Sequence, residues 1–598
     1  MKKKIIYPTK LQRSWTLVVL LFLFSLQTFS QAPDWLWAKG MGGTNADIAY
    51  SVATDASGNV YTAGTFWDTA DFDPGPGVFT LTSVGLHDIF ISKSDASGNF
   101  IWAKRMGGTS GEQVKSIAID ISGNIYSAGA FQATSDFDPG TQVFNLTSAG
   151  DWDIFISKLD NFGNFVWAKA MGGINNDAGF SIAISAAGSG DVYTTGSFHG
   201  TADFDPGPGV FNISLANTAS WGGYADIFVS KLNSAGNFIW AKAMGGATDD
   251  EGYAIAIDSA GAGDVYTTGY FSGTADFDPG IGVFNLISDG AADIFISKLD
   301  ASGNYVWARR MGGTGYEFSY SMAVDNAGGG GIYTTGVFEF TADFDPGPGT
   351  YNLTSAGSYD IFISKLDGSG SFVWAKAFNG SSADFGNALT LDASGNVYTT
   401  GYFDGTADFD PGTGIFNLAS VGSYDLFISK LDSSGNFVWA KRAGGAEQEH
   451  SRSIALSDNG NVHIAGSFFS ATSYFGSITL TNAAILYIAD IFIAKLDTLS
   501  MPTGNNEAVN VGDGINLFPN PASDELIVRS WEFGEIKEIE IYDVMGEKRL
   551  TPTLPRNTGQ VSKGEGVRID VSSLAAGIYF ITVTDGEGKK AMRKFVKM

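Results

Sequence analysis

The chain is poor in three kinds of residue that often mark chemistry: cysteine, histidine and the basic residues. It has no cysteine and four histidines in 598 residues, and 36 lysines and arginines are outnumbered by 63 aspartates and glutamates. Without cysteine there is no disulfide, no thiolate metal site and no acylated lipoprotein cysteine. A formal net charge of −27 repels nucleic acid and anionic lipid, so we expect neither as a partner.

The few histidines do not suggest a catalytic centre. They occupy unrelated places in the sequence pattern, at His87, His199, His450 and His463. The sequence has no order of serine, histidine and aspartate typical of a triad, no zinc-ligand spacing and no phosphate-binding glycine loop. It therefore predicts no catalytic residue.

Long apolar runs are missing after the first 30 residues. At the N-terminus a basic stretch over 2–13 precedes an apolar run over 15–26, and small residues at Thr28 and Ser30 suit a cleavage site. The run is shorter than the roughly 20 residues that a transmembrane helix needs. We predict a secretory signal peptide over residues 1–30 and no transmembrane segment.

Internal repetition is what the chain has in abundance. The frame Trp-Ala-Lys/Arg occurs seven times, 65 to 73 residues apart, at Trp37, Trp102, Trp167, Trp240, Trp307, Trp374 and Trp439. A second frame, Asp-Ile/Leu-Phe-Ile/Val, also occurs seven times, at Asp88, Asp153, Asp226, Asp293, Asp360, Asp425 and Asp490. The first Trp frame has no Asp-Ile-Phe frame before it, and the last Asp-Ile-Phe frame has no Trp frame after it. Seven units are complete only if the two ends of the array pair, which is typical of a closed ring.

Each repeat has the pattern of four short β-strands. In one repeat we expect them near 116–120, 124–131, 153–159 and 164–169, where Ile, Val, Phe, Tyr and Trp are frequent. Turns of the type Asp-Ala-Ser-Gly-Asn join the first strand to the second and the third to the fourth. Several strands are apolar on both faces, which indicates that they pack between neighbouring sheets.

We therefore predict an all-β fold, with a seven-bladed β-propeller over residues 31–497. If the Trp strand is the outer strand of each blade, residues 35–39 complete the blade that contains the last Asp-Ile-Phe strand, 490–496. Both tight turns then fall on one face, and two longer connections fall on the other. One of these follows each Trp strand and opens in most repeats with Met-Gly-Gly. The Trp rings are expected to pack between blades.

The other long connection is the best candidate for metal binding. It carries Asp-Phe-Asp-Pro-Gly in six repeats, with carboxylates at Asp71, Asp73, Asp136, Asp138, Asp203, Asp205, Asp276, Asp278, Asp343, Asp345, Asp408 and Asp410. Two carboxylates in a turn supply part of the shell of 6–8 oxygens that Ca²⁺ prefers. In the alternative, one Asp caps a Pro-Gly turn, the other meets solvent and the Phe fills the interface between blades. The seventh repeat has Ser-Tyr-Phe-Gly from Ser473 instead.

An insert over 215–225 breaks the repeat and lies among the long connections. It contains Trp221 and Tyr224. Aromatic side chains in an irregular exposed loop suit contact with carbohydrate or protein. Alternatively, the insert folds over its own blade.

The repeated strands resemble a known family of repeats. The Trp-Ala-Lys/Arg and Asp-Ile-Phe frames are similar to those of SBBP-type bacterial β-propeller repeats, over residues 34–497. This resemblance implies the propeller fold and does not indicate a ligand.

The C-terminal part has a different, non-repeating pattern. After a predicted linker over 498–512, strands are expected over 513–598 near 525–530, 538–542, 567–571 and 578–584. The landmarks of this part, in order, are Leu-Phe-Pro-Asn-Pro-Ala from Leu517, Ile-Tyr-Asp-Val-Met-Gly from Ile541, Leu-Ala-Ala-Gly-Ile-Tyr-Phe from Leu574 and Lys-Phe-Val-Lys from Lys594.

Together these landmarks resemble the type A sorting domain of the type IX secretion system. The resemblance implies a small Ig-like β-sandwich that the type IX secretion machinery recognises at the outer membrane. It also implies that the domain is removed as the cargo is released or attached to the cell surface. The predicted location is therefore outside the cell or on its surface.

These features favour a secreted or surface-associated propeller that acts as a non-catalytic binding, adhesion or scaffold module. Its ligand would be a glycan or a surface protein, with Ca²⁺ as the one cofactor that the sequence suggests. The alternative is a polysaccharide-degrading or other hydrolytic propeller. That alternative requires carboxylates, histidine or tyrosine that converge around the central axis from unrepeated positions.

Overall fold

The computed structural model describes residues 32–185, 190–215, 224–258, 263–326, 330–483 and 487–497, and seven strands between 515 and 597. Every element in these ranges is a β-strand. No helix of the described residues is long and apolar enough to cross a membrane. The predicted signal peptide and linker, and Trp221, lie outside the described residues.

Seven antiparallel units of four strands make up the described part of 35–496. In the first six units the strands pair in chain order. The first three units are β2 (Asp47–Thr54), β3 (Val60–Phe66), β6 (Asp88–Ser94) and β7 (Phe100–Gly108); β8 (Glu112–Ile119), β9 (Ile125–Asp136), β10 (Asn145–Leu159) and β11 (Phe165–Gly173); and β12 (Ala178–Ile184), β13 (Val192–Phe198), β16 (Asp226–Leu232) and β17 (Phe238–Gly246).

The next three units are β18 (Asp250–Ile257), β19 (Val265–Phe271), β22 (Asp293–Leu299) and β23 (Tyr305–Gly313); β24 (Phe318–Val324), β25 (Ile332–Phe338), β28 (Asp360–Leu366) and β29 (Phe372–Gly380); and β30 (Phe385–Leu391), β31 (Val397–Asp408), β32 (Asn417–Leu431) and β33 (Phe437–Gly445). The last unit joins the two ends of the array: β34 (Glu449–Leu456), β35 (Val462–Phe468), β38 (Asp490–Leu496) and β1 (Trp35–Gly43).

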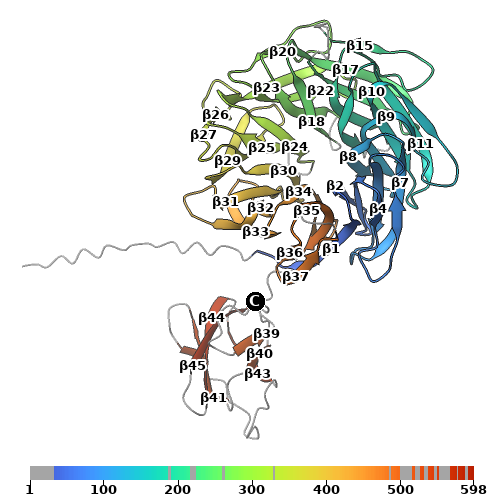
Figure 1. Ribbon diagram of the computed structural model, residues 1–598. Helices are drawn as coiled ribbons and strands as arrows, with labels where there is room; N and C mark the ends of the chain where they lie inside the picture. Colours follow the sequence, from blue (N-terminus) through green and yellow to red (C-terminus); the bar gives the residue numbers. More distant parts are fainter. Residues whose placement is uncertain are drawn as a thin grey trace, which may run out of the picture.

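The predicted pairing of the two ends is confirmed. β1 runs antiparallel to β38, with Ala38 opposite Ala494 and Met41 opposite Ile491. The first strands also contact one another in sequence, from β2 through β8, β12, β18, β24 and β30 to β34, and β34 packs against β2. The backbone N–H of Val52 donates to Ser453 Oγ at 3.0 Å across this last contact. The seven units therefore follow one another around a ring (Figure 1).

Turns of the predicted kind join the strands. In the first unit Asp55 Oδ1 accepts hydrogen bonds from the backbone N–H groups of Ser57 and Asn59, both at 3.0 Å. Gly58 has φ of 78°, a conformation that glycine adopts without a steric penalty. The Asp and Gly of each turn therefore have separate tasks, one as a hydrogen-bond acceptor and the other as the left-handed residue.

A small hairpin in the long connection links each unit to its neighbour. β4 (Thr69–Asp71) pairs with β5 (Thr80–Thr82) and also with the end of β1, where Asp71 lies opposite Gly42. The equivalent hairpins are β14 (Thr201–Asp203) with β15 (Asn212–Ser214), β20 (Thr274–Asp276) with β21 (Asn285–Ile287), β26 (Thr341–Asp343) with β27 (Asn352–Thr354), and β36 (Thr472–Phe475) with β37 (Ile478–Thr481). In two units the hairpin continues the long strands β9 and β10, or β31 and β32.

The prediction that Met-Gly-Gly opens a loop is wrong. Met41, Gly42 and Gly43 are the last residues of β1. A Cβ atom on Gly43 would lie 2.2 Å from the carbonyl oxygen of Thr69, so only glycine lets the hairpin of the next unit come this close. The repeated glycines therefore mark a contact between strands, whereas in the sequence they have the appearance of a loop.

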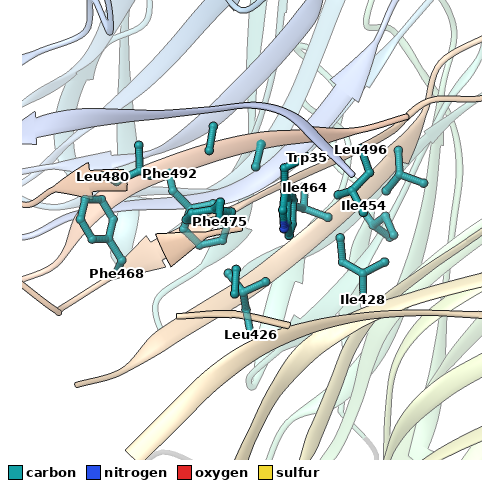
Figure 2. Close-up of a cluster of buried hydrophobic side chains, with 14 of the residues drawn as sticks. Trp35, Leu426, Ile428, Ile454, Ile464, Phe468, Phe475, Leu480, Phe492 and Leu496 are labelled. Carbon is teal, nitrogen blue, oxygen red and sulfur yellow. The ribbon is translucent and has the colours of Figure 1, made fainter. Parts of the chain in front are cut away.

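Buried apolar side chains fill the interfaces between units. The cluster in Figure 2 combines Trp35 from β1, Phe492 and Leu496 from β38, and Leu426 and Ile428 from β32 of the preceding unit. The ends of the chain and the sixth unit thus share one core.

The Trp rings contact the neighbouring unit, as predicted. Trp37 Nε1 donates to the carbonyl oxygen of Ala96 at 3.3 Å, and Trp374 Nε1 donates to that of Ser433 at 3.3 Å. Trp37 itself is half-buried. Trp35, at 8% exposed, is the buried ring of the strand that joins the two ends.

The C-terminal strands form two antiparallel sheets. One contains β39 (Ile515–Phe518), β40 (Glu525–Ser530) and β43 (Gly566–Asp570), and the other contains β42 (Lys548–Leu550), β41 (Ile536–Asp543), β44 (Gly577–Asp585) and β45 (Lys590–Lys597). The four predicted strands are present. β39, β42 and β45 were not predicted, because their sequences are short or rich in polar residues.

Candidate functional site

The six Asp-Phe-Asp-Pro-Gly loops have the same internal hydrogen bonds. In the first, Asp71 Oδ1 accepts from the backbone N–H of Asp73 at 3.0 Å and of Phe79 at 2.8 Å, and Asp73 Oδ1 accepts from Gly75 at 2.8 Å. The same three bonds recur at the other candidate aspartates, Asp136 and Asp138, Asp203 and Asp205, Asp276 and Asp278, Asp343 and Asp345, and Asp408 and Asp410. One oxygen of each carboxylate thus holds the turn in shape.

Between the two aspartates, the phenylalanine is fully buried. Phe72 is 0% exposed and its ring lies 4.8 Å from that of Phe90. Phe475 takes the same place in the seventh unit, which has neither aspartate, and it is also buried. The phenylalanine is therefore present even in the unit that lacks both carboxylates. Its role is to pack in the core, independently of any role of the aspartates.

Calcium binding by these loops stays a prediction. Within the described ranges, no group of three or more His, Cys, Asp or Glu side chains is placed to hold a metal ion. A loop that binds Ca²⁺ would have to supplement its two aspartates with backbone carbonyls and water.

The predicted aromatic insert is described only in part. Tyr224 lies just before β16 and is 51% exposed, so its ring is available to a ligand. Trp221 belongs to the residues that are not described.

The four histidines are each held by different neighbours. His87 Nδ1 lies 3.1 Å from the carbonyl oxygen of Glu112, and the His450 ring lies 4.2 Å from the Tyr402 ring. His199 is hydrogen-bonded to a backbone carbonyl at the unit edge. His463 packs against Trp37 at 6.0 Å, in the place where six other units pair a tyrosine with their Trp. Burial lowers the pKa of His463 to about 3 and that of His450 to about 4, so both rings are neutral.

Pairs of buried carboxylates, which sequence reasoning missed, lie between neighbouring units. The Asp of an Asp-Ile-Phe frame meets an Asp or Glu at the head of the next unit. Asp153 and Asp177 are 3% and 1% exposed, and a Cβ atom on Gly172 would lie 2.6 Å from Asp153 Oδ1 and 2.9 Å from Asp177 Oδ2. Burial raises the pKa of Asp153 to about 6 and that of Asp177 to about 7. Burial in this interface therefore favours the protonated form of the pair as the pH falls towards 6.

A charge pattern in the sequence marks two kinds of pair. Arg105, Arg310 and Arg442 each form an ion pair with the Asp of an Asp-Ile-Phe frame. In these three units the next unit begins with a glutamate: Glu112, Glu317 and Glu449. The other four units have Gly or Ala in place of the arginine. In these cases the acidic residue at the head of the next unit is an aspartate: Asp47, Asp177, Asp250 or Asp384. This covariation between repeats is the signal that the sequence offered for the buried pairs.

The first strands carry a second feature that sequence reasoning missed, a β-bulge at the same position in every unit. In β2 the pairing with β3 shifts between Ala49 and Ser51, which leaves Tyr50 outside the ladder. A glycine permits the close approach of the two strands at this shift, because a Cβ atom on Gly64 would lie 1.9 Å from the carbonyl oxygen of Ile48. Seven residues are left out in this way: Tyr50, Lys115, Phe180, Tyr253, Tyr320, Asn387 and Arg452. We call them the axial residues.

The axial residues are the least repetitive part of the array. All seven are half-buried, and they lie on the strands that contact one another around the inside of the ring. One arc is aromatic, with ring centroids 5.5 Å apart for Phe180 and Tyr253 and 5.7 Å apart for Tyr253 and Tyr320. In the other arc Lys115 and Arg452 lie 4.9 Å and 5.4 Å from the Tyr50 ring. The axis thus has an aromatic side and a cationic side.

Comparison with known proteins finds distant relatives of the chain. An uncharacterised WD repeat-containing protein of Acanthamoeba polyphaga mimivirus is 25% identical over 72% of the chain and 36% of its own length. The regulatory protein FlaEY of Caulobacter vibrioides is 22% identical over 67% of the chain and 41% of its own length. The chain therefore spans about two fifths of these relatives or less.

Solved structures give weaker matches. Sqt1 from Chaetomium thermophilum aligns over 73% of the chain and 97% of its own, with a TM-score of 0.34 and 11% identity. A protein of unknown function from Bacteroides caccae aligns over 67% of the chain and 94% of its own, with a TM-score of 0.29 and 11% identity.

The C-terminal part has a more specific match. Residues 516–598 match the family model of the secretion system C-terminal sorting domain, which bears out the resemblance of the sequence landmarks to the type IX sorting domain. Such a domain indicates export to the cell surface or the medium and contact with the type IX secretion machinery. The C-terminal segment of this chain is thus a type IX secretion sorting domain.

Proposed function

We propose that the seven units are the blades of a β-propeller, and that this propeller is a surface or secreted module that binds its ligand without turning it over. The ring of first strands and the antiparallel pairing of β1 with β38 support the propeller. The repeated frames agree with SBBP-type repeats, and the viral relative is named for WD repeats. The two C-terminal sheets suit an Ig-like sandwich.

The observation that carries the binding role is the change of residue at one axial position. Lys115, Asn387 and Arg452 replace the aromatic residues that other units have there. A position with a purely structural task would be expected to repeat, as the Asp-Phe-Asp-Pro-Gly loops do. Varied, half-buried polar and aromatic groups on neighbouring strands around one axis are typical of a binding site.

The test of binding is a screen of the full secreted chain against a glycan array and a panel of surface proteins, with mass spectrometry of each ligand after incubation. We expect retention of a ligand with its mass unchanged. Release of a shortened saccharide or peptide would contradict the proposal and favour a hydrolase.

Export is tested separately in a host that has the type IX system. A chain without residues 513–598 is expected to accumulate in the periplasm, because the sorting domain is the part that the machinery recognises. Normal amounts of the shortened chain at the surface or in the medium would contradict this role.

A further inference from the structure

The cationic side of the axis has an unusual electrostatic setting. Neither Lys115 nor Arg452 takes part in an ion pair within the described part of the chain. The protein has 63 acidic residues against 36 basic ones, so partners for two lysines or arginines are plentiful. Two unpaired cations near each other in such a chain need another explanation.

The positive charges of Lys115 and Arg452 also repel each other. Burial, with the nearby charge of Arg452 as a second cause, lowers the pKa of Lys115 to about 8. Arg452 Nε is buried and has no hydrogen-bond partner. A buried donor without an acceptor destabilises the protein. An anion between the two side chains would remove both the repulsion and the unmet donor.

The surrounding rings restrict the kind of anion. Tyr50 lies on the strand between those of the two cations, with its ring 4.9 Å from Lys115 and 5.4 Å from Arg452. On the strands that follow that of Lys115, Phe180, Tyr253 and Tyr320 form a row of aromatic side chains. Flat aromatic faces pack well against the apolar face of a sugar ring, and tyrosine hydroxyls bond to sugar hydroxyls. Glu251, on the same side, is half-buried, and its side chain is hydrogen-bonded to that of Tyr253.

Long-range charge restricts the ligand further. A chain of net charge −27 repels a polymer with a charge on every unit of a short backbone, such as nucleic acid. A saccharide with widely spaced anionic groups is repelled less, and one such group is enough for two cations.

We infer that the axial residues Lys115, Arg452 and Tyr50, with this aromatic row, bind an acidic sugar, a uronate or a sulfated unit of a polysaccharide. The carboxylate or sulfate lies between Lys115 and Arg452, and the sugar ring lies against the tyrosines. This inference rests on the proposed binding function and names its ligand class.

The test is isothermal titration calorimetry of the full chain with four probes: an oligogalacturonate, a sulfated galactan oligosaccharide, a neutral galactan oligosaccharide of equal length and a polyglutamate peptide. We expect the two acidic saccharides, or one of them, to bind at least about tenfold more tightly than the neutral one. Which of the two binds distinguishes the carboxylate from the sulfate.

Variants locate the site. Arg452→Gln and Lys115→Met are each expected to weaken binding of the acidic saccharide by about tenfold, since each removes one charged hydrogen-bond donor. Lys242→Met is the matched control, because Lys242 is a half-buried lysine on the outer strand β17, and its affinity should equal that of the wild type. Thermal unfolding of each variant shows whether it is folded.

Three results would overturn the inference: equal affinity for the neutral saccharide, equal or tighter binding of polyglutamate, or folded Lys115→Met with unchanged affinity. If these occur while the wider screen still retains a ligand, the binding function stands and only the ligand class is wrong. If the screen retains nothing, both fail.

Discussion

The loops with Asp-Phe-Asp-Pro-Gly recur in six units and the axial bulges in all seven, but they differ in how much their residues vary. Six loops have the same residues and the same three hydrogen bonds, shown by Asp203 with Asp205 and Phe211. The axial position keeps its bulge and changes its side chain, from Phe180 to Lys115 to Arg452. In a repeat protein, a residue that is the same in every unit indicates that it stabilises the same backbone structure in each. A residue that varies where the backbone is constant indicates a function of the ring as a whole.

This comparison gives four predictions. They concern the joined ends of the array, the constant phenylalanine, the buried carboxylates and metal binding by the loops.

The largest effect concerns the pairing of the two ends. Deleting residues 31–40 removes most of β1, Trp35 included, from its sheet with β38 and uncovers the core that Trp35 helps to fill. We expect a lower melting temperature than after deletion of ten residues from the predicted linker, 498–512. Equal melting temperatures of the two deletions, measured by calorimetry, would show that the ring does not depend on this pairing.

The second effect concerns the constant phenylalanine. Phe204 is 0% exposed, and truncation of a buried Phe to Ala typically costs about 3–5 kcal/mol of unfolding free energy. Val210 in the same loop is 72% exposed, so Val210→Ala is the matched control and should change stability by less than about 0.5 kcal/mol. Denaturant unfolding measures both. A similar loss in both variants would mean that the loop as a whole, and not the buried ring, stabilises the interface.

The third effect concerns the buried carboxylate pairs, and it depends on pH. Burial raises the pKa of Asp47 and Asp250 to about 8 and that of Asp177 and Asp384 to about 7. An unfolded aspartate has a pKa near 3.9, so between about pH 4 and pH 8 these four carboxyl groups hold more protons in the folded protein than in the unfolded chain. The stability that they contribute falls as pH rises through this window.

We therefore expect a higher melting temperature at pH 5 than at pH 8, and Asp250→Asn should reduce the difference. Asp458→Asn is a suitable control, since Asp458 is exposed and is not one of the paired carboxylates. A melting temperature that rises from pH 5 to pH 8 would contradict the buried protonated pairs.

The smallest effect concerns Ca²⁺. If the loops bind it with the affinity of extracellular modules, roughly 10⁻⁴–10⁻³ M, several millimolar Ca²⁺ should raise the melting temperature through linkage. Mg²⁺ at equal ionic strength separates coordination from screening. A shift specific to Ca²⁺ that shrinks in Asp203→Asn/Asp205→Asn would support metal binding. Identical curves with Ca²⁺, Mg²⁺ and chelator would leave these aspartates as turn residues only.

The sequence predicted the strands well, because each is defined by a repeated frame. The pairing of β1 with β38 follows from two frames that are out of step by one. The ends of the strands were harder, since glycines that permit close contact, such as Gly43, are also the commonest residues of loops.

The axial site was not predictable by the same reasoning. Ala49, Tyr50 and Ser51 have the pattern of an ordinary alternating strand, and the shift in pairing depends on Gly64 in the next strand. The buried pairs were hidden for a related reason, because Asp153 and Asp177 belong to different repeats and meet only when the units are side by side. Both features arise from contacts between segments, which a single repeat does not contain.

The most direct test of the central claim, that constant positions build the ring and the variable axial position binds, is a crystal structure of the full chain with an acidic trisaccharide of the class that calorimetry selects. The account predicts that the anionic group lies about 2.7–2.9 Å from nitrogen atoms of Lys115 and Arg452, with a sugar ring against Tyr50 or Tyr253. A saccharide bound on the Asp-Phe-Asp-Pro-Gly loops, with the axial residues free, would contradict it.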